Sequence, residues 1–528
     1  NANPGTPAAP FLTISHAVSV AVPGTTIWVD AGTFQEQVQI NQSLNIIGNS
    51  RTKTIVKAPV TMANVPNPNG TGQPIISASG AANTVNISKI KIDGDGGRTV
   101  SSFVGMHYAE ASGTFNDNHI TGIHDSPVFS GVQSGVAFIA NHAWDVSVAQ
   151  TVSVTNNLID DYQKGGILVN ELNTQGIVTG NVVTGQNTPG VTAQNGIQFG
   201  FGAYGTITGN TVTGNLWNSA HPHTYVAAGI LLAGVGVDNF DAATGMATMI
   251  SGNNLNGNES GMLAAAGGFG YDHNAGVTYG GDFFANNKIH AELYDPSTVP
   301  SLLNSYDKRA DNPAQTNIVF GSVQYGVDYA SAGHQLNVSA GTFVENVTIH
   351  QAVDVRGANY LIAGCAGRGA ESYINGGVGT GVDITSDDAK LTGFQVSGAT
   401  GVRARSHIGV EVKNNLINAL AAGIDAGTVV TTAPKNLELS GNCINLASQA
   451  VAPTTPTVGV FLSGVSGVQA PVVSNNTIAG PFYGHMLYDV NATPATVISG
   501  GSITAAMQGV AILNIDPISL AAVAASNA

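Results

Sequence analysis

Charged side chains are scarce in this chain. Asp, Glu, Lys and Arg together make up 9% of its 528 residues, whereas about a quarter is usual. Lys and Arg total only 17. They form no cluster or stripe, which argues against nucleic-acid binding, because basic side chains must meet the phosphates. Hydrophobic residues still make up 43%, so the composition is not that of a disordered chain.

Cysteine and long apolar runs are also nearly absent. The two cysteines, Cys365 and Cys443, lie in the second half. They are able to pair, but the sequence does not decide this, and it shows no metal-binding spacing. No apolar run reaches about 18 residues, so we expect no membrane span. No signal peptide is present at Asn1, so we expect a removed leader or an excerpt of a longer chain. Abundant Asn and Thr then favour a bacterial extracellular protein.

A long internal repeat organises the chain. Residues 31–34, Ala-Gly-Thr-Phe, return 309 positions later as residues 340–343. The same offset relates Gly48 to Gly357. We therefore expect two units of one kind, at 1–305 and 306–518, with an Ala/Ser-rich tail or linker at 519–528.

A short repeat runs inside each unit: Asn or Gly, then Asn, any residue, then Ile or Val. Each copy predicts a short strand, and Asn and Gly tolerate the left-handed backbone of a sharp corner. Stacking the copies places each second Asn above the next, so that the amides form a hydrogen-bonded ladder. The expected ladder residues are Asn118, Asn157, Asn181, Asn210, Asn254, Asn287, Asn415, Asn442 and Asn476.

Coils of this kind must stack, because one coil cannot bury its apolar face alone. The first rung of such a stack is an exposed edge. Apolar residues at helical spacing from Ile14 to Ala21 predict a capping helix near residues 13–21. Val323 and Val327 repeat the pattern less completely in the second unit.

The opening run resembles the start of right-handed parallel β-helix proteins of the pectin-lyase-like superfamily. The similarity rests on residues 3–6 (Asn-Pro-Gly-Thr), 27–34 (Ile-Trp-Val-Asp-Ala-Gly-Thr-Phe) and 44–48 (Leu-Asn-Ile-Ile-Gly), and on the Asn-Asn-x-Ile repeats. It implies an all-β fold: a right-handed parallel β-helix, or solenoid, in two tandem units, each with an N-terminal capping segment. It does not fix the function, because the superfamily holds lyases, hydrolases, esterases, epimerases, tailspikes and non-catalytic adhesins.

The catalytic signatures of the superfamily are mostly missing. Of the polygalacturonase set only a paired Asp160-Asp161 is present, and its place directly after a repeat motif favours a polar turn. Two long insertions carry side chains suited to acid–base work on a sugar, although packing of the loops is the alternative interpretation. They contain His221, His223 and Tyr225, then Tyr271, Asp272 and His273, with Asp282 shortly after.

Two further features suggest ligands. Asp93 and Asp95 lie in a Gly-rich segment that offers carboxylates to Ca²⁺, but the calcium-loop pattern is absent and a Gly-rich turn is the alternative; no other cofactor is expected. Trp144 and Trp217 are candidates for stacking on sugars. We predict that Trp28, in the opening strand, lies in the core.

Three functions remain open. The first is a structural or adhesive module of a bacterial surface protein, whose partners are other copies of itself or neighbouring domains, with polysaccharide as another candidate. The second is a polysaccharide lyase, hydrolase or uronate epimerase with its site on the loops of the first unit. The third is a non-catalytic carbohydrate-binding module. Duplication, low charge and the missing signatures favour the first.

Overall fold

The computed structural model describes residues 3–513, apart from a set of single positions and short segments. These are 69, 99, 101, 126–128, 143–147, 218–226, 239–241, 244, 266–273, 294–304, 307–309, 315–317, 428–429, 432–436, 447–456, 465, 468–470, 489–490, 493–496 and 505–507. The predicted tail at 519–528 lies outside the described residues. In the described part no helix has the length and apolar character needed to cross a membrane.

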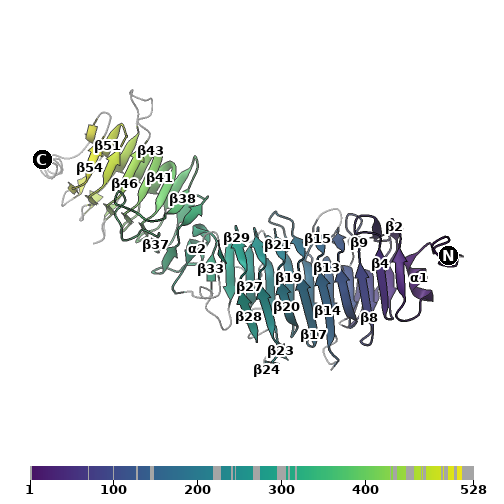
Figure 1. Ribbon diagram of the computed structural model, residues 1–528. Helices are drawn as coiled ribbons and strands as arrows, with labels where there is room; N and C mark the ends of the chain where they lie inside the picture. The colour runs from purple at the N-terminus through teal and green to yellow at the C-terminus, as the bar shows by residue number, and fades with distance from the viewer. Residues whose placement is uncertain are drawn as a thin grey trace. The chain divides into compact units, whose positions relative to one another are not determined.

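The chain divides into two compact units, Asn1–Tyr306 and Asp307–Ala528, one residue from the predicted boundary. Each unit is a right-handed parallel β-helix, in which successive turns of the chain lay strands side by side (Figure 1). Both the all-β class and the solenoid architecture predicted from the sequence are confirmed.

Three parallel sheets wall the first unit, and the chain passes through them in the order 1A, 1B, 1C. Sheet 1A contains β1 (Thr26–Val29), β4 (Leu44–Gly48), β8 (Thr84–Ser88), β11 (Ser112–Asn116), β14 (Gln150–Thr155), β17 (Thr174–Thr179), β20 (Tyr204–Thr208), β25 (Thr248–Ser251) and β28 (Val277–Gly280). Sheet 1B contains β2 (Gly32–Gln35), β5 (Thr54–Lys57), β9 (Lys91–Asp93), β12 (His119–Thr121), β15 (Leu158–Asp160), β18 (Val182–Thr184), β21 (Thr211–Thr213), β26 (Asn254–Asn256), β29 (Phe283–Ala285) and β31 (Ser305–Tyr306). Sheet 1C contains β3 (Val38–Ile40), β7 (Gly70–Ser79), β10 (Phe103–Ala109), β13 (Val136–Asn141), β16 (Gly165–Asn170), β19 (Asn195–Gly200), β22 (Ala228–Ala233), β27 (Ser260–Ala265) and β30 (Ile289–Leu293). Outside these sheets, β6 (Val65–Asn67) pairs with β7, and β23 (Val237–Asp238) pairs with β24 (Ala242–Ala243).

The second unit repeats this plan. Sheet 2A contains β34 (Gln335–Val338), β37 (Asp354–Arg356), β40 (Lys390–Thr392), β42 (Glu411–Lys413), β45 (Glu438–Ser440), β49 (Val472–Ser474) and β53 (Val497–Ser499). Sheet 2B contains β35 (Gly341–Phe343), β38 (Ser372–Asn375), β41 (Gln395–Ala404), β43 (Leu416–Gly427), β46 (Cys443–Leu446), β50 (Thr477–Ala479) and β54 (Ser502–Thr504). The long β41 and β43 continue into sheet 2C, with β36 (Val347–Ile349), β39 (Thr380–Ile384), β47 (Val458–Ser463), β51 (Tyr483–Tyr488) and β55 (Gln508–Leu513). The short strands are β32 (Ala310–Asp311), β33 (Ile318–Phe320), β44 (Val430–Thr431), β48 (Ser466–Gly467) and β52 (Asn491–Ala492).

Each unit opens with a short helix that covers its first coil. In the first unit this is α1 (Ile14–Val20), close to the predicted 13–21, with Thr13 as N-cap. The carboxylate of Glu36 accepts hydrogen bonds from the backbone N–H groups of Ile14 and Ser15, at 2.7 and 2.9 Å. It therefore ties the helix N-terminus to the coil beneath, where a negative charge is favourable.

The second cap is built in the same way at the same offset. Helix α2 (Val323–Tyr329) has Ser322 as N-cap. Glu345, the repeat counterpart of Glu36, accepts from the N–H groups of Val323 and Gln324 at 2.8 and 3.1 Å. The long repeat therefore encodes the cap and its fastening together.

The asparagine ladder holds the corner between sheets 1A and 1B. The Oδ1 atom of Asn181 accepts from both the backbone N–H and the Nδ2 of Asn157, at 3.0 and 2.9 Å. The Nδ2 of Asn181 donates to the carbonyl of Val154 at 2.8 Å. In this way each rung provides hydrogen-bond partners for backbone groups that would otherwise be unpaired at the corner. The ladder comprises Asn118, Asn157, Asn181, Asn210, Asn253 and, at its end, Asp282.

Two of the predicted ladder residues are corrected. The residue before each rung has a left-handed backbone, and in this coil that residue is Gly252, with φ of 67°. The rung is therefore Asn253, and the predicted Asn254 is the first residue of β26, with its side chain exposed. Asn287 belongs to a second ladder, one corner further on.

The second ladder lies at the corner that follows sheet 1B. Asn215 bonds to Asn258, and Asn258 to Asn287, with Nδ2–Oδ1 distances of 3.0 and 3.2 Å. Gly257 and Asn286 supply left-handed backbone before their rungs, with φ of 66° and 52°. The same local solution is used at both corners, which is why the sequence motif alone does not distinguish them.

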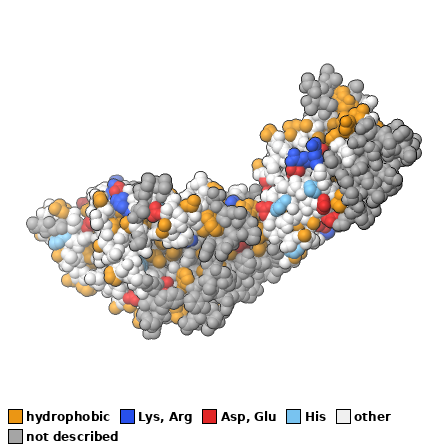
Figure 2. Space-filling model, turned by 180° about the vertical axis from the view of Figure 1, so that it is seen from behind, with side chains coloured by type: hydrophobic (Ala, Val, Ile, Leu, Met, Phe, Trp, Pro, Cys, Tyr) orange, Lys and Arg blue, Asp and Glu red, His pale blue; other side chains and the backbone are white. Residues whose placement is uncertain are grey.

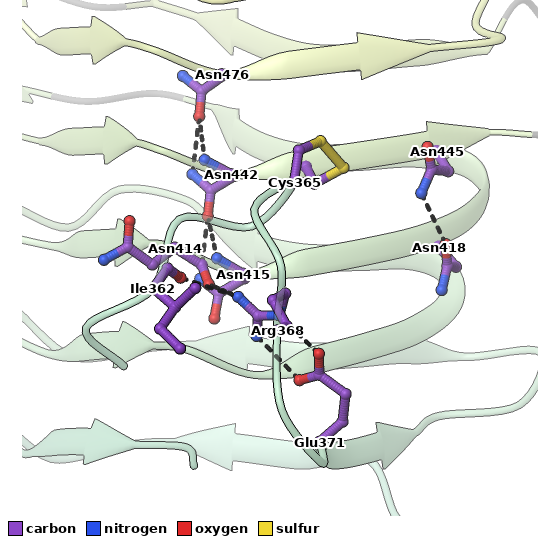
Figure 3. Close-up of a disulfide and its surroundings, with 11 residues drawn as sticks. Ile362, Cys365, Arg368, Glu371, Asn414, Asn415, Asn418, Asn442, Asn445 and Asn476 are labelled. Atoms are coloured by element: carbon purple, nitrogen blue, oxygen red, sulfur yellow. Dashed lines mark hydrogen bonds and ion pairs between the residues drawn. A yellow bond between two sulfur atoms is a disulfide. The ribbon is translucent and has the colours of Figure 1, made fainter. Parts of the chain in front are cut away.

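In the second unit Asn415, Asn442 and Asn476 form the ladder, as predicted, with Nδ2–Oδ1 distances of 3.1 and 2.9 Å (Figure 3). A loop after β37 crosses this corner and is bonded to it by the disulfide Cys365–Cys443. The guanidinium of Arg368, paired with Glu371 at 2.6 Å, also donates to the carbonyl of Asn414 at 2.7 Å. The loop thereby fastens several coils from outside.

A buried histidine interrupts the apolar interior of the second unit. His485 is 3% exposed, and both of its ring nitrogens lack a hydrogen-bond partner. It stands in register between Val460 and Val510 on the neighbouring strands. Burial lowers the pKa of His485 to about 4, because the charged ring would lose its hydration.

We expect Asn181→Leu to destabilise the first unit by about 1–3 kcal/mol, because the N–H of Asn157 and the carbonyl of Val154 lose their partners. Urea unfolding measures the change. The matched control is Asn254→Leu, on an exposed position outside the ladder, which should stay within about 0.5 kcal/mol of the parent. Equal losses in the two variants would contradict the ladder assignment.

We expect the second unit to lose stability as the pH falls from 6.5 towards about 4. The folded pKa of His485 is below the unfolded one, so the unfolded chain takes up the proton first. The loss approaches roughly 3 kcal/mol and then levels off. The control is His485→Val, which places a valine between Val460 and Val510. Unfolding curves across this pH range should show that this variant is more stable than the parent and does not lose this stability as the pH falls. The same pH slope in both proteins would refute the assignment.

Candidate functional site

The predicted catalytic residues of the two insertions have no described geometry. His221, His223, Tyr225, Tyr271, Asp272 and His273 lie outside the described residues, as does Trp144. Asp282, the candidate that follows these insertions, lies within the described residues and ends the first ladder. Its Oδ1 accepts from the N–H and Nδ2 of Asn253 at 2.9 and 2.8 Å, and burial raises its pKa. Asp282 is thus a structural residue of the corner.

The Gly-rich segment proposed for Ca²⁺ is occupied by cationic side chains. Lys57 and Arg98 contact the two oxygens of Asp95, at 2.5 and 2.8 Å, and Lys91 contacts Asp93 at 2.7 Å. The hydrogen bonds from Lys57 and Arg98 lower the pKa of Asp95. Within the described ranges no three His, Cys, Asp or Glu side chains gather as a metal site. This geometry favours the Gly-rich turn over a calcium site.

The paired aspartates of the sequence each meet a histidine from the preceding coil. His119 Nε2 lies 3.0 Å from Asp160 Oδ2, and His124 Nε2 lies 3.4 Å from Asp161 Oδ2. His124 also stacks on Phe129, with ring centroids 4.5 Å apart. Sequence reasoning missed both histidines, although the stacking of Asn118 under Asn157 places His119 one coil below Leu158.

The surroundings of these pairs shift the pKa values of Asp160 and His124. Burial raises the pKa of Asp160, but hydrogen bonds from His119 and Thr121 outweigh it and leave the pKa lowered. The hydrogen bond to Asp161 raises the pKa of His124. Both effects favour the charged, paired state.

The residues that follow Asp161 are packed against neighbouring coils. Tyr162 is buried and donates to Asn215 Oδ1 at 2.6 Å. Lys164 donates to the carbonyl of Ala193 at 2.7 Å, and burial lowers its pKa to about 8. A general acid for sugar chemistry needs a carboxyl whose pKa is raised and which faces a substrate. Asp160 has the opposite shift and is engaged by His119, so this corner is an ion-paired turn.

Sheet 1A presents an uncharged outer face. Its nine strands contain no Asp, Glu, Lys, Arg or His. The outward positions are mostly Thr, Ser and Asn. Trp28, predicted in the core, points outward and is 75% exposed, because its neighbour Val29 takes the inward position of the alternating strand. Charged side chains elsewhere gather in small clusters among uncharged ones (Figure 2).

The equivalent sheet of the second unit is charged. On sheet 2A, Lys390 contacts Glu411 at 2.6 Å, and Lys413 contacts Glu411 at 2.8 Å and Glu438 at 2.6 Å. Arg356 pairs with Asp354 in β37. In the long repeat these two residues stand where Ile47 and Asn45 stand in the first unit. The same backbone arrangement therefore carries an uncharged surface in the first unit and a charged surface in the second.

A shallow groove of about 410 Å³ runs beside sheet 2B. The Nδ2 of Asn445 donates to Asn418 Oδ1 at 3.2 Å along it (Figure 3). The lining residues are uncharged: Gly377, Ser397, Gly398, Asn418, Ala419, Leu420, Asn445 and Leu446.

We expect NMR titration to show the pKa of His124 raised above its ordinary value, because Asp161 stabilises the charged ring. Asp161→Asn should lower this pKa. Asp160→Asn is the control, since Asp160 pairs with His119, and it should leave the His124 titration in place. A His124 titration that is insensitive to Asp161→Asn would contradict the pairing.

Comparison with known protein families gives one match. Residues 1–216 match the family described as "Protein of unknown function (DUF1565)". No curated protein gives a significant match to the sequence.

Solved structures of similar architecture include three carbohydrate-active proteins. The catalytic domain of a GH87 alpha-1,3-glucanase in complex with nigerose is 12% identical over 96% of this chain, with a TM-score of 0.30. A GH136 lacto-N-biosidase from Eubacterium ramulus is 11% identical over 97%, with a TM-score of 0.36. The chain spans 66% of each of these two proteins, just under two thirds of their length. A PL6 family alginate lyase is 10% identical over 96% of this chain and 97% of its own, with a TM-score of 0.19. The strand pairing of the chain itself identifies the protein as a right-handed parallel β-helix protein, as its opening residues and Asn-containing repeats predicted.

Proposed function

We propose that this protein is a structural or adhesive module of a bacterial extracellular surface, which acts by self-association or by binding a surface or a glycan. The observation that carries the proposal is the distribution of charge. The charged side chains around Asp95, Asp160 and Glu411 form ion pairs within their own unit, whereas sheet 1A is uncharged along all nine strands. Such a face is suited to contact, because no charge has to be stripped of water.

The disulfide supports a location outside the cytosol. Cys365 and Cys443 are bonded across 78 residues of chain, and such bonds persist in oxidising compartments. An exported module would also benefit from the three asparagine ladders and the fastened caps, since these keep the coils in register without a partner.

Binding of a neutral glycan is the second candidate. The groove beside Asn418 and Asn445 favours it, because the described lining residues offer amides and small apolar side chains without charge. A catalytic role of the first unit would depend on the insertions that carry His221 and His273.

We expect no cleavage or epimerisation of pectate, alginate or other acidic polysaccharides, assayed by unsaturated products and reducing ends. We expect the protein instead to self-associate, or to be retained on bacterial surfaces or insoluble glycans. Turnover that disappears in His273→Ala or Tyr271→Phe would overturn the proposal in favour of an enzyme. Absence of both retention and self-association would also contradict it.

A further inference from the structure

We propose that the outer face of sheet 1A is the surface through which two copies of this chain associate. The inference rests on the proposed function and names the partner and the site. The face consists of the outward side chains of β1, β4, β8, β11, β14, β17, β20, β25 and β28.

The face repeats itself from strand to strand. In the column next to the first ladder, Asn116, Thr155, Thr179 and Thr208 are in register on successive strands. Strands of one sheet are about 4.8 Å apart, so hydroxyl and amide groups recur at this interval. A surface with such a period matches a second copy of itself, as a two-fold interface requires.

Hydrogen bonds along the columns fix these side chains before any partner arrives. Thr155 Oγ1 donates to Asn116 Oδ1 at 2.8 Å, and Thr179 and Thr208 share a bond of 3.0 Å. Further along the face, Asn86 Nδ2 donates to Asn45 Oδ1 at 2.8 Å. Because these rotamers are already ordered, association would cost less conformational entropy than it does for free side chains.

Apolar side chains stand among the polar columns. Trp28 is 75% and Met249 45% exposed. Ile47 and Ile177 occupy outward positions and are half-buried. Exposed tryptophan and methionine are enriched where proteins meet. Burial of these groups would supply the favourable contribution that hydroxyl pairs alone do not.

Charge confines the contact to this face. The chain carries a net charge of −15, so two copies repel each other, and the repulsion is weakest where they meet through neutral surface. On the equivalent sheet 2A, Lys390, Glu411, Lys413 and Glu438 form a charged row. Charged outward side chains are a known protection against association of β-structure. The first unit lacks this protection at the same place in its fold.

The size of the face suits a second protein copy. Nine strands at about 4.8 Å spacing span about 40 Å, and strands of this length are about 15 Å wide. Each copy would bury about 600 Å², or about 1,200 Å² in total. This exceeds the roughly 1,000 Å² that distinguishes a specific interface from an incidental contact.

The test compares one charge placed on two faces of the same coil. Ile177 lies on β17 of sheet 1A, and Val182, 43% exposed, lies on β18 of sheet 1B. Sedimentation equilibrium of the full chain should show a reversible dimer that strengthens with added salt, because salt screens the repulsion of the two acidic chains. Ile177→Lys should weaken this association by about tenfold or more, whereas Val182→Lys should leave it unchanged.

A second variant guards against misfolding. The double change Asn45→Asp and Ile47→Arg copies the ion pair that Asp354 and Arg356 form at the same place in the second unit. It should fold, as judged by thermal unfolding, and also weaken the dimer. Equal effects of Ile177→Lys and Val182→Lys would overturn the inference. A monomeric parent that still binds surfaces or glycans would overturn it while sparing the proposed function; a monomeric parent that binds nothing would overturn both.

Discussion

The structure depends on one hydrogen-bonding device at the corner of each coil. A residue with left-handed backbone turns the chain, and the asparagine that follows it bonds both to the backbone N–H and to the amide of its neighbour one coil earlier. A buried corner without such partners would leave backbone groups unsatisfied at a cost of about 1–3 kcal/mol each. Once the corner is fixed, the inward side chains of successive coils fall into line, and the sheets follow from the stacking.

The ladder also explains why the two units share a backbone plan but not a surface. Only inward and corner positions are constrained by stacking, so outward positions are free to differ. Asn45 and Ile47 on one unit and Asp354 and Arg356 on the other occupy the same outward places. One unit thus offers an uncharged face and the other an ion-paired one, without any change in the path of the chain.

The ionisable groups show the same separation of fold from surface. The pairs His119–Asp160 and His124–Asp161 join coils that are stacked in space. Their hydrogen bonds favour the charged forms of Asp160 and His124, which is the behaviour of an ion-paired surface.

Short-range signals in the sequence determined the fold class, the two units, the capping helices and most of the ladder, because left-handed corners and helix caps are local conformations with local residue preferences. Where the local signal was ambiguous the prediction was wrong: Gly252-Asn253-Asn254 offers two rungs, and Asn287 uses the same motif at a different corner. Only the tertiary structure decided that Trp28 points outward, that Cys365 bonds to Cys443, and that the paired aspartates face histidines of the coil before. These features depend on which coil lies above which, and variable loops between the coils hide that register from the sequence.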